Sequence, residues 1–166
     1  MDTYNMIDFN KKKGFICDMD GVIYHGNRVL PGVAEFIQWL HDEEKEYLFL
    51  TNNSGYTPRE LHQKLERMGL DVSEEHFYTS ALATAAFLRD QAPGCSVFAI
   101  GEAGLLNALY DAGITMNDVN PDYVVVGEGR SYSLDTLTKA TNLVWKGAKL
   151  IGANSDVSGP IENGIA

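Results

Sequence analysis

Hydrophobic positions along the chain alternate between short continuous apolar runs and longer stretches with helical spacing. The runs have the length of strands and end in polar or glycine-rich segments; they lie at 14–18, 47–50, 97–100, 123–126 and 149–153. Between them, apolar residues recur three and four positions apart. This spacing predicts helices at 32–44, 57–69, 80–91, 105–112 and 134–145. Strands and helices that alternate in this way predict an α/β protein with parallel sheets.

Two local signals refine this pattern. The dipeptide Gly26-Asn27 lies between short apolar runs, which predicts a small β-hairpin within residues 21–31, over the end of the first strand. Thr57, Pro58 and Glu60 form a capping box with proline at the first helical position, so a helix should begin there.

The composition changes near Phe77–Ser80, and we place a domain boundary there, between residues 1–79 and 80–166. In the second part, 97–104 and 123–130 resemble each other, each with four strand residues followed by Gly-Glu and a small residue. We interpret this as two similar strand-to-helix turns rather than a duplication. After residue 156 the pattern predicts no closing helix or strand.

Composition narrows the possible partners. Of the 166 residues, 45% are apolar and 22% charged, as in an ordinary soluble globular protein. The net charge of −10 argues against a nucleic acid or an anionic membrane surface as a partner, and no run approaches the ~20 apolar residues of a membrane span. Cys17 and Cys95 form no CxxC pair and the N-terminus has no signal pattern, so we expect a cytoplasmic protein.

The first apolar run, which has the pattern of a buried strand, ends in Asp18-Met19-Asp20-Gly21. Two neighbouring carboxylates at the end of a core strand are costly, because they repel each other and lose hydration. The spacing does not fit an EF-hand, and neither a dinucleotide fingerprint nor a GxxxxGK[ST] phosphate loop is present. A nucleophilic carboxylate beside an acid/base carboxylate remains, the pattern of aspartyl-phosphate chemistry. The alternative is a pair of solvated loop aspartates.

A second polar segment, Thr51-Asn52-Asn53, ends the next predicted strand. In a parallel sheet it would lie at the same carboxyl edge as Asp18, where open α/β sheets bind ligands. A hydroxyl and backbone amides at such a turn are good donors to phosphate oxygens. Taken alone the segment is a weak signal, but with Asp18 and Asp20 it predicts a phosphate site.

The segments 17–26, 51–55 and 152–156 together resemble the haloacid dehalogenase-like hydrolases. The resemblance covers essentially the whole chain and is strongest to the NagD-like branch of sugar-phosphate and nucleotide phosphatases. It implies a Rossmann-like parallel-sheet core, formed in part by residues 1–79, and an α/β cap inserted after the second motif, at 80–166.

The resemblance also implies residue roles. Asp18 would attack phosphorus, and Asp20 would protonate the leaving oxygen and then activate water. Thr51 and Asn52 would hold the phosphate, while Asp18 and the Asp20 carbonyl would bind Mg²⁺. In the cap, Asn154 and Asp156 match a family motif; substrate contact and a structural Asx turn remain equally open. For His25 in the hairpin, a surface position is favoured over a substrate contact.

The chain departs from the family pattern at its end. Members continue past the cap with a lysine and an acidic motif, and this chain ends before both. We therefore expect an incomplete cap and a truncated form of a longer phosphatase, inactive on its own. The expected activity is Mg²⁺-dependent hydrolysis of a small phosphorylated metabolite, either a sugar phosphate or a nucleoside monophosphate. A phosphotransferase or mutase, or a non-catalytic binding fragment, is the alternative; a homo-oligomer formed through the cap is compatible with the resemblance.

Overall fold

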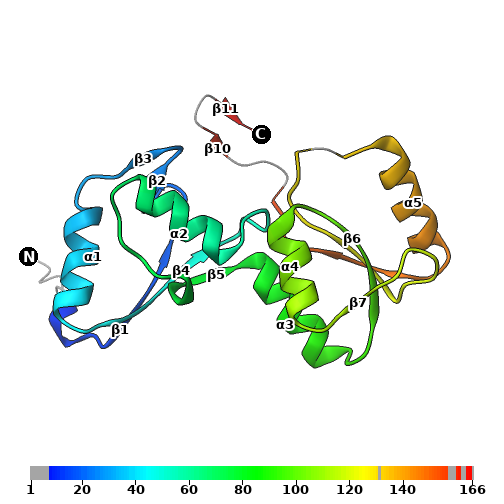
Figure 1. Cartoon of the computed structure of the whole chain (residues 1–166), viewed down its shortest axis with the longest axis horizontal. Coiled ribbons are helices and arrows are strands. Elements are labelled where there is room, and N and C mark those ends of the chain that lie inside the picture. Colours follow the sequence, from blue (N-terminus) through cyan, green and yellow to red (C-terminus); the bar gives the residue numbers. More distant parts are fainter. Residues whose placement is uncertain (1–7, 131, 157–159, 162–163, 166) are drawn as a thin grey trace, which may run out of the picture.

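A computed structural model describes residues 8–130, 132–156, 160–161 and 164–165. Figure 1 shows two α/β halves side by side along the longest axis, each built around its own sheet. All strand pairs within the two larger sheets are parallel. The predicted α/β class is therefore confirmed.

The first sheet has three strands in the order β1-β4-β5. They are β1 (Gly14–Asp18), β4 (Glu46–Thr51) and β5 (Phe77–Thr79). The helices α1 (Val33–Asp42) and α2 (Pro58–Arg67) connect them. The predicted capping box is present at the start of α2, where Thr57 accepts from the Glu60 N–H and Glu60 accepts from the Thr57 N–H.

One face of the first sheet is covered and the other is open. Both α1 and α2 contribute to a single apolar cluster with Phe49 and Phe77. On the opposite face, the side chain of Ile16 is 71% exposed. The prediction of a buried first strand was wrong, because β1 pairs only with β4 and nothing in the described part of the chain covers this face.

The second sheet has four strands in the order β7-β6-β8-β9. They are β7 (Thr115–Met116), β6 (Ser96–Ile100), β8 (Tyr123–Val126) and β9 (Lys149–Gly152). The helices α3 (Ser80–Gln91) and α4 (Ala103–Asp111) share one apolar cluster with this sheet, and α5 (Leu134–Trp145) forms another. Val124 and Val125, adjacent in β8, belong to different clusters, so helices cover both faces of this sheet.

The remaining elements are short. The predicted hairpin forms from β2 (Tyr24–His25) and β3 (Arg28–Val29). Two single-turn 3₁₀ helices lie at Phe9–Lys11 and Glu74–His76. The sequence pattern missed β5 and β7, and it was wrong after residue 156, where β10 (Pro160–Ile161) pairs with β11 (Gly164–Ile165). Strands of two or three residues are too short for a periodic signal.

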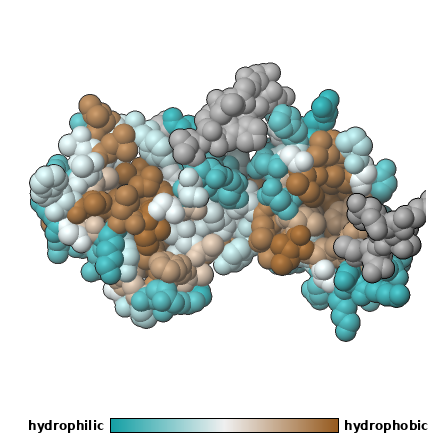
Figure 2. Space-filling model, turned by 180° about the vertical axis from the view of Figure 1, so that it is seen from behind, coloured by the Kyte–Doolittle hydropathy of each residue, from teal (hydrophilic) through white to brown (hydrophobic). Residues whose placement is uncertain are grey.

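Apolar residues also reach the surface of both halves. Seen from behind, brown areas lie on each half of the molecule (Figure 2). Among the described helices, none combines the length and the apolar character needed to cross a bilayer.

Candidate active site

The turn after β1 carries two carboxylates, one on each side of a buried methionine. Met19 is fully buried, whereas Asp18 and Asp20 on either side of it are exposed. The Met19 carbonyl accepts the N–H groups of Val22 and Ile23 at 3.2 and 2.8 Å, which folds the chain back at once. Both aspartates are therefore held at the tip of a tight turn by Met19, which is fixed in the core.

The electrostatic surroundings of Asp20 are mixed. Part of its surface is open, yet burial by surrounding atoms raises the pKa of its carboxyl, and the charge of Asp18 raises it further. The ammonium of Lys64, a hydrogen bond from Tyr24 and the nearby His25 act in the opposite direction. Asp20 thus sits where its protonated form is favoured more than in water.

Lys64 comes from α2 and was not predicted as a site residue. Its Nζ lies 3.8 Å from the centre of the Tyr24 ring and 5.7 Å from that of Tyr56, as a cation–π contact requires. Burial lowers the pKa of this ammonium, and the charge of Asp20 partly restores it. No local sequence signal separates Lys64 from the other charged positions of its helix.

The turn after β4 is ordered by its own side chains. Thr51 is buried, and its hydroxyl oxygen accepts the Asn53 N–H at 3.1 Å. The side-chain Oδ1 of Asn53 accepts the N–H groups of Gly55 and Tyr56 at 2.8 and 3.3 Å.

This turn and the aspartates meet at one sheet edge. Asp18 pairs with Leu50 in the parallel register, so Asp18 and Thr51 end neighbouring strands. Among the described residues, none of the hydrogen bonds joins Thr51 or Asn52 to either aspartate.

Asn52 is contacted from two distant parts of the second half. Its carbonyl accepts the Ser80 hydroxyl at 2.7 Å, and its side-chain Nδ2 donates to Asp156 Oδ2 at 2.6 Å. The Asp156 N–H in turn donates to Asn154 Oδ1 at 2.9 Å, which is the Asx turn considered from the sequence. The structure thus brings Asp156 directly to Asn52, and Asn154 shapes the turn that carries Asp156.

The next residues of the same loop receive two more contacts. The Gly104 N–H donates to the Gly55 carbonyl at 2.9 Å, and the Glu128 N–H donates to Ser54 Oγ at 2.6 Å. Ser54 is fully buried between the two halves. Glu128 follows β8 and Gly104 follows β6, so the carboxyl edge of the second sheet meets the loop that leaves the first.

Glu128 brings a third carboxylate towards the aspartates. Burial and the charge of Asp20 raise the pKa of its carboxyl, while Arg130 and a hydrogen bond from the Asn53 side chain lower it. The sequence contains one signal for this residue, the repeated Gly-Glu pair, but that pair by itself indicates only two similar strand-to-helix turns.

The donor atoms at the tip of the β1 turn suit a hard cation. Asp18 and Asp20 offer carboxylate and carbonyl oxygens, and Mg²⁺ commonly binds one or two carboxylates and takes its other ligands from water and substrate phosphate. Within residues 8–130 and 132–156, no group of three or more His, Cys, Asp or Glu side chains is arranged to hold a metal. The residues therefore fit Mg²⁺ as a partial ligand set.

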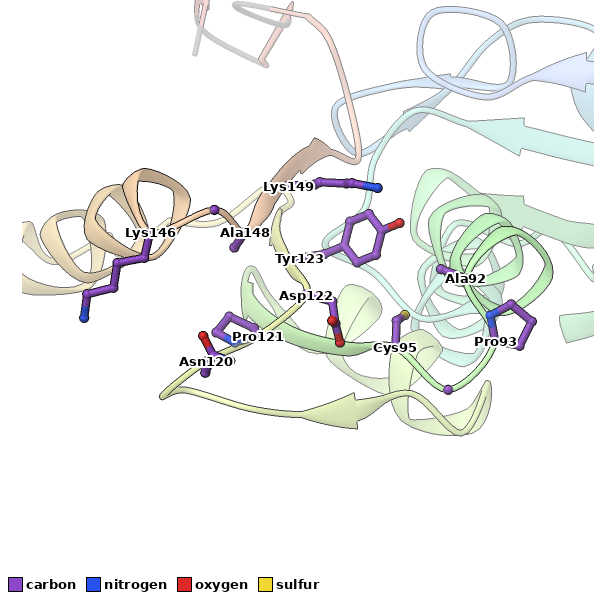
Figure 3. Close-up of a pocket in the computed structure, with 12 residues that line it drawn as sticks. Ala92, Pro93, Cys95, Asn120, Pro121, Asp122, Tyr123, Lys146, Ala148 and Lys149 are labelled. Carbon is purple, nitrogen blue, oxygen red and sulfur yellow. The ribbon is translucent and has the colours of Figure 1, made fainter.

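A separate hollow of about 550 Å³ lies at the opposite edge of the second sheet. Figure 3 shows Cys95, Asp122, Tyr123 and Lys149 along it, with Lys146 pointing away. These residues precede or begin β6, β8 and β9, whereas the aspartate site lies at carboxyl ends of strands. The hollow is therefore not part of the candidate site.

Comparisons with known proteins identify the family of the chain. Residues 15–115 match the model of the haloacid dehalogenase-like hydrolases. A dihydroxyacetone phosphatase of Corynebacterium glutamicum is 44% identical over 91% of this chain and 55% of its own length. The ribonucleotide monophosphatase NagD of Escherichia coli K12 is 45% identical over 89% of this chain and 58% of its own length. This chain thus spans little more than half the length of these relatives.

Solved structures give the same result. NagD from E. coli K-12 superposes with a TM-score of 0.84 at 43% identity, covering 92% of this chain and 61% of that one. A 4-nitrophenylphosphatase from Thermotoga maritima superposes with a TM-score of 0.88 at 32% identity, covering 95% of this chain and 60% of that one. The chain therefore belongs to the haloacid dehalogenase-like hydrolases, in their NagD-like branch.

Proposed function

We propose that the protein is a Mg²⁺-dependent phosphatase that hydrolyses small phosphate monoesters through an aspartyl phosphate on Asp18. The observation that carries the proposal is the meeting of Asp18, Asp20 and the Thr51–Asn52 turn at one edge of the first sheet. A nucleophile, an acid/base group and phosphate-binding donors are the parts that this chemistry needs. Membership of a hydrolase family supports the same reading.

In the proposed reaction, a carboxylate oxygen of Asp18 attacks phosphorus and the ester P–O bond breaks. Asp20 gives its proton to the leaving oxygen; the raised pKa of its carboxyl suits that role. Asp20 then takes a proton from water, whose oxygen attacks phosphorus and releases Asp18. Thr51 and Asn52 orient the phosphate. Bound by Asp18 and the Asp20 carbonyl, Mg²⁺ would neutralise negative charge on the phosphate.

Three further assignments belong to the proposal. Residues 1–79 form the N-terminal part of the core and 80–166 the cap, an assignment supported by the separate sheets of the two parts. Asp156 acts by accepting a hydrogen bond from Asn52, and Asn52 binds the phosphate. The two cysteines are unbridged thiols, which supports a reducing, cytoplasmic location.

The substrate class follows from the cap and from the relatives. A cap that contacts the loop at 52–56 screens the site from solvent, which favours a small ester over a phosphoprotein. Related proteins are named for dihydroxyacetone phosphatase, ribonucleotide monophosphatase and acid sugar phosphatase activity. We infer a sugar phosphate or a nucleoside monophosphate as substrate, and a homo-oligomer through the cap as a further possibility to test by light scattering.

The proposal is tested with p-nitrophenyl phosphate and the intact protein. We expect release of p-nitrophenol that requires Mg²⁺ and is abolished by EDTA and restored by added Mg²⁺. Transfer of the phosphate to an added alcohol or sugar in preference to water would instead identify a phosphotransferase. No turnover of any phosphate ester, with retained ligand binding, would leave a binding protein.

A further inference from the structure

The backbone of Glu128 holds this residue next to the loop at 52–56. It lies two residues after the end of β8, a central strand of the second sheet, and its N–H donates to the buried Ser54 Oγ at 2.6 Å. The Glu128 carbonyl also accepts the Glu102 N–H at 3.2 Å. Both bonds fix the residue at the boundary between the two halves.

The preceding residue shows how close this approach is. A Cβ atom on Gly127 would lie 2.8 Å from Ser54 Oγ and 2.7 Å from a Leu105 methyl group. Such distances are shorter than real Cβ contacts, so only glycine permits the turn to approach the loop this closely. The position of Glu128 is therefore built into the turn.

The position of this backbone places an exposed carboxylate beside the loop that follows Thr51. The charge of Asp20 raises the pKa of the Glu128 carboxyl, so the two carboxylates lie close enough to repel each other. The charge of Arg130, two residues further on, offsets only part of that repulsion. A carboxylate near the acid/base residue is unfavourable for a phosphatase unless it acts on the rest of the substrate.

The geometry points to a role in substrate choice: we propose that Glu128 is a specificity-determining residue that favours leaving groups carrying hydroxyl groups and disfavours those carrying a carboxylate or a second phosphate. The inference rests on the proposed function, because Asp20 must protonate the leaving oxygen for Glu128 to lie beside the leaving group. A carboxylate accepts hydrogen bonds from hydroxyl groups. It repels another anion held next to it.

Two esters of nearly equal size test this inference. The leaving groups of 2-hydroxyethyl phosphate and phosphoglycolate differ only by a hydroxymethyl group in place of a carboxylate. We expect the intact protein to prefer 2-hydroxyethyl phosphate in kcat/KM. Glu128→Gln should change the ratio of the two kcat/KM values by about tenfold or more towards phosphoglycolate, which corresponds to about 1.4 kcal/mol.

The matched control is Asp118→Asn, which removes an exposed carboxylate of the same half whose partner is Lys139, 2.6 Å away. This variant should leave the ratio unchanged. An unchanged ratio in Glu128→Gln, including an equal fall for both esters, would overturn the inference and leave Glu128 with a structural role only. Absence of turnover by the unmutated protein with p-nitrophenyl phosphate would refute the proposed function itself, and the inference with it.

A binding measurement gives the same comparison without turnover. In an Asp18→Asn background, calorimetry with each ester yields two dissociation constants. Adding Glu128→Gln should lower the dissociation constant of phosphoglycolate relative to that of 2-hydroxyethyl phosphate by a similar factor. If the two constants change in parallel, substrate choice does not depend on this carboxylate.

Discussion

At the residue scale, the candidate site is a small set of charges around a buried methionine. The sequence alone indicated the pair because two carboxylates directly follow an apolar run, yet in the structure Asp18 and Asp20 are exposed and only Met19 between them is buried. Lys64 and Glu128 could not be found in the same way, because their closeness to Asp20 depends on how separate elements pack. Local sequence carries no information of that kind.

The proposed acid role of Asp20 predicts that the effect of removing it depends on the leaving group. An alkyl alkoxide needs a proton in order to leave, whereas p-nitrophenolate leaves readily without one. Asp20→Asn should therefore lower kcat/KM for glycerol phosphate at least about a hundredfold more than for p-nitrophenyl phosphate. Steady-state assays of both esters check this, and equal losses for the two would contradict the assignment.

At the element scale, the loop at 52–56 is the joint between the two halves. It receives hydrogen bonds from α3, from the start of α4 and from the turn after β8, and its Asn52 donates to Asp156 after β9. In one of the two repeated Gly-Glu segments the glycine has a physical reason, because Gly127 lets the second half approach Ser54 closely. Gly104, at the start of α4 and outside the repeated pair, does the same at Ser54 and Tyr56.

Because Gly104 lies so close to the loop at 52–56, a single added methyl group there should lower both stability and activity. A Cβ on Gly104 would lie 2.5 Å from the Tyr56 carbonyl oxygen and 2.6 Å from that of Ser54, both backbone atoms that cannot rotate away. Gly104→Ala should destabilise the protein by about 1–3 kcal/mol and lower kcat/KM at least about tenfold. Urea unfolding and the p-nitrophenyl phosphate assay measure the two effects.

Gly101→Ala is the matched control just before α4, because its Cβ would meet a side-chain atom of Leu105, at the longer distance of 3.0 Å, and no backbone atom of the 52–56 loop. Gly101→Ala should lower both the free energy of unfolding and kcat/KM by less than Gly104→Ala does. If the two variants behave alike, the contact at Gly104 does not hold the halves together.

Elements with clear periodicity were predicted well, and those without it were not. The helices α1 to α5 and the four- to six-residue strands lie within about two residues of the ranges that the apolar spacing indicated. The burial of β1 was wrong because an apolar run gives the strand but not what covers it. Only the packed structure shows that β1 has a single neighbour.

At the scale of the whole molecule, the open face of the first sheet has a consequence for the isolated chain. Parallel sheets are normally covered on both faces, yet Ile16 is 71% exposed on an edge strand. We expect residues 1–166, expressed alone, to associate as their concentration rises. Ile16→Lys should reduce this association, as measured by light scattering across a dilution series.

Val119→Lys provides the comparison, since Val119 is 76% exposed but lies in a loop outside both sheets. It should leave the association unchanged. A chain that stays monomeric at all concentrations, or that responds equally to both substitutions, would show that the open face is not a contact surface.

The central claim, that Asp18 is the nucleophile, is tested most directly by trapping the acylphosphate. The intact protein is mixed with substrate and Mg²⁺, quenched with acid and treated with borohydride, which reduces an aspartyl phosphate to homoserine. Peptide mass spectrometry should find homoserine at position 18 in a substrate-dependent amount, and Asp18→Asn should remove both this product and the turnover. Turnover without any reduced residue at position 18, or full turnover in Asp18→Asn, would contradict the proposed mechanism.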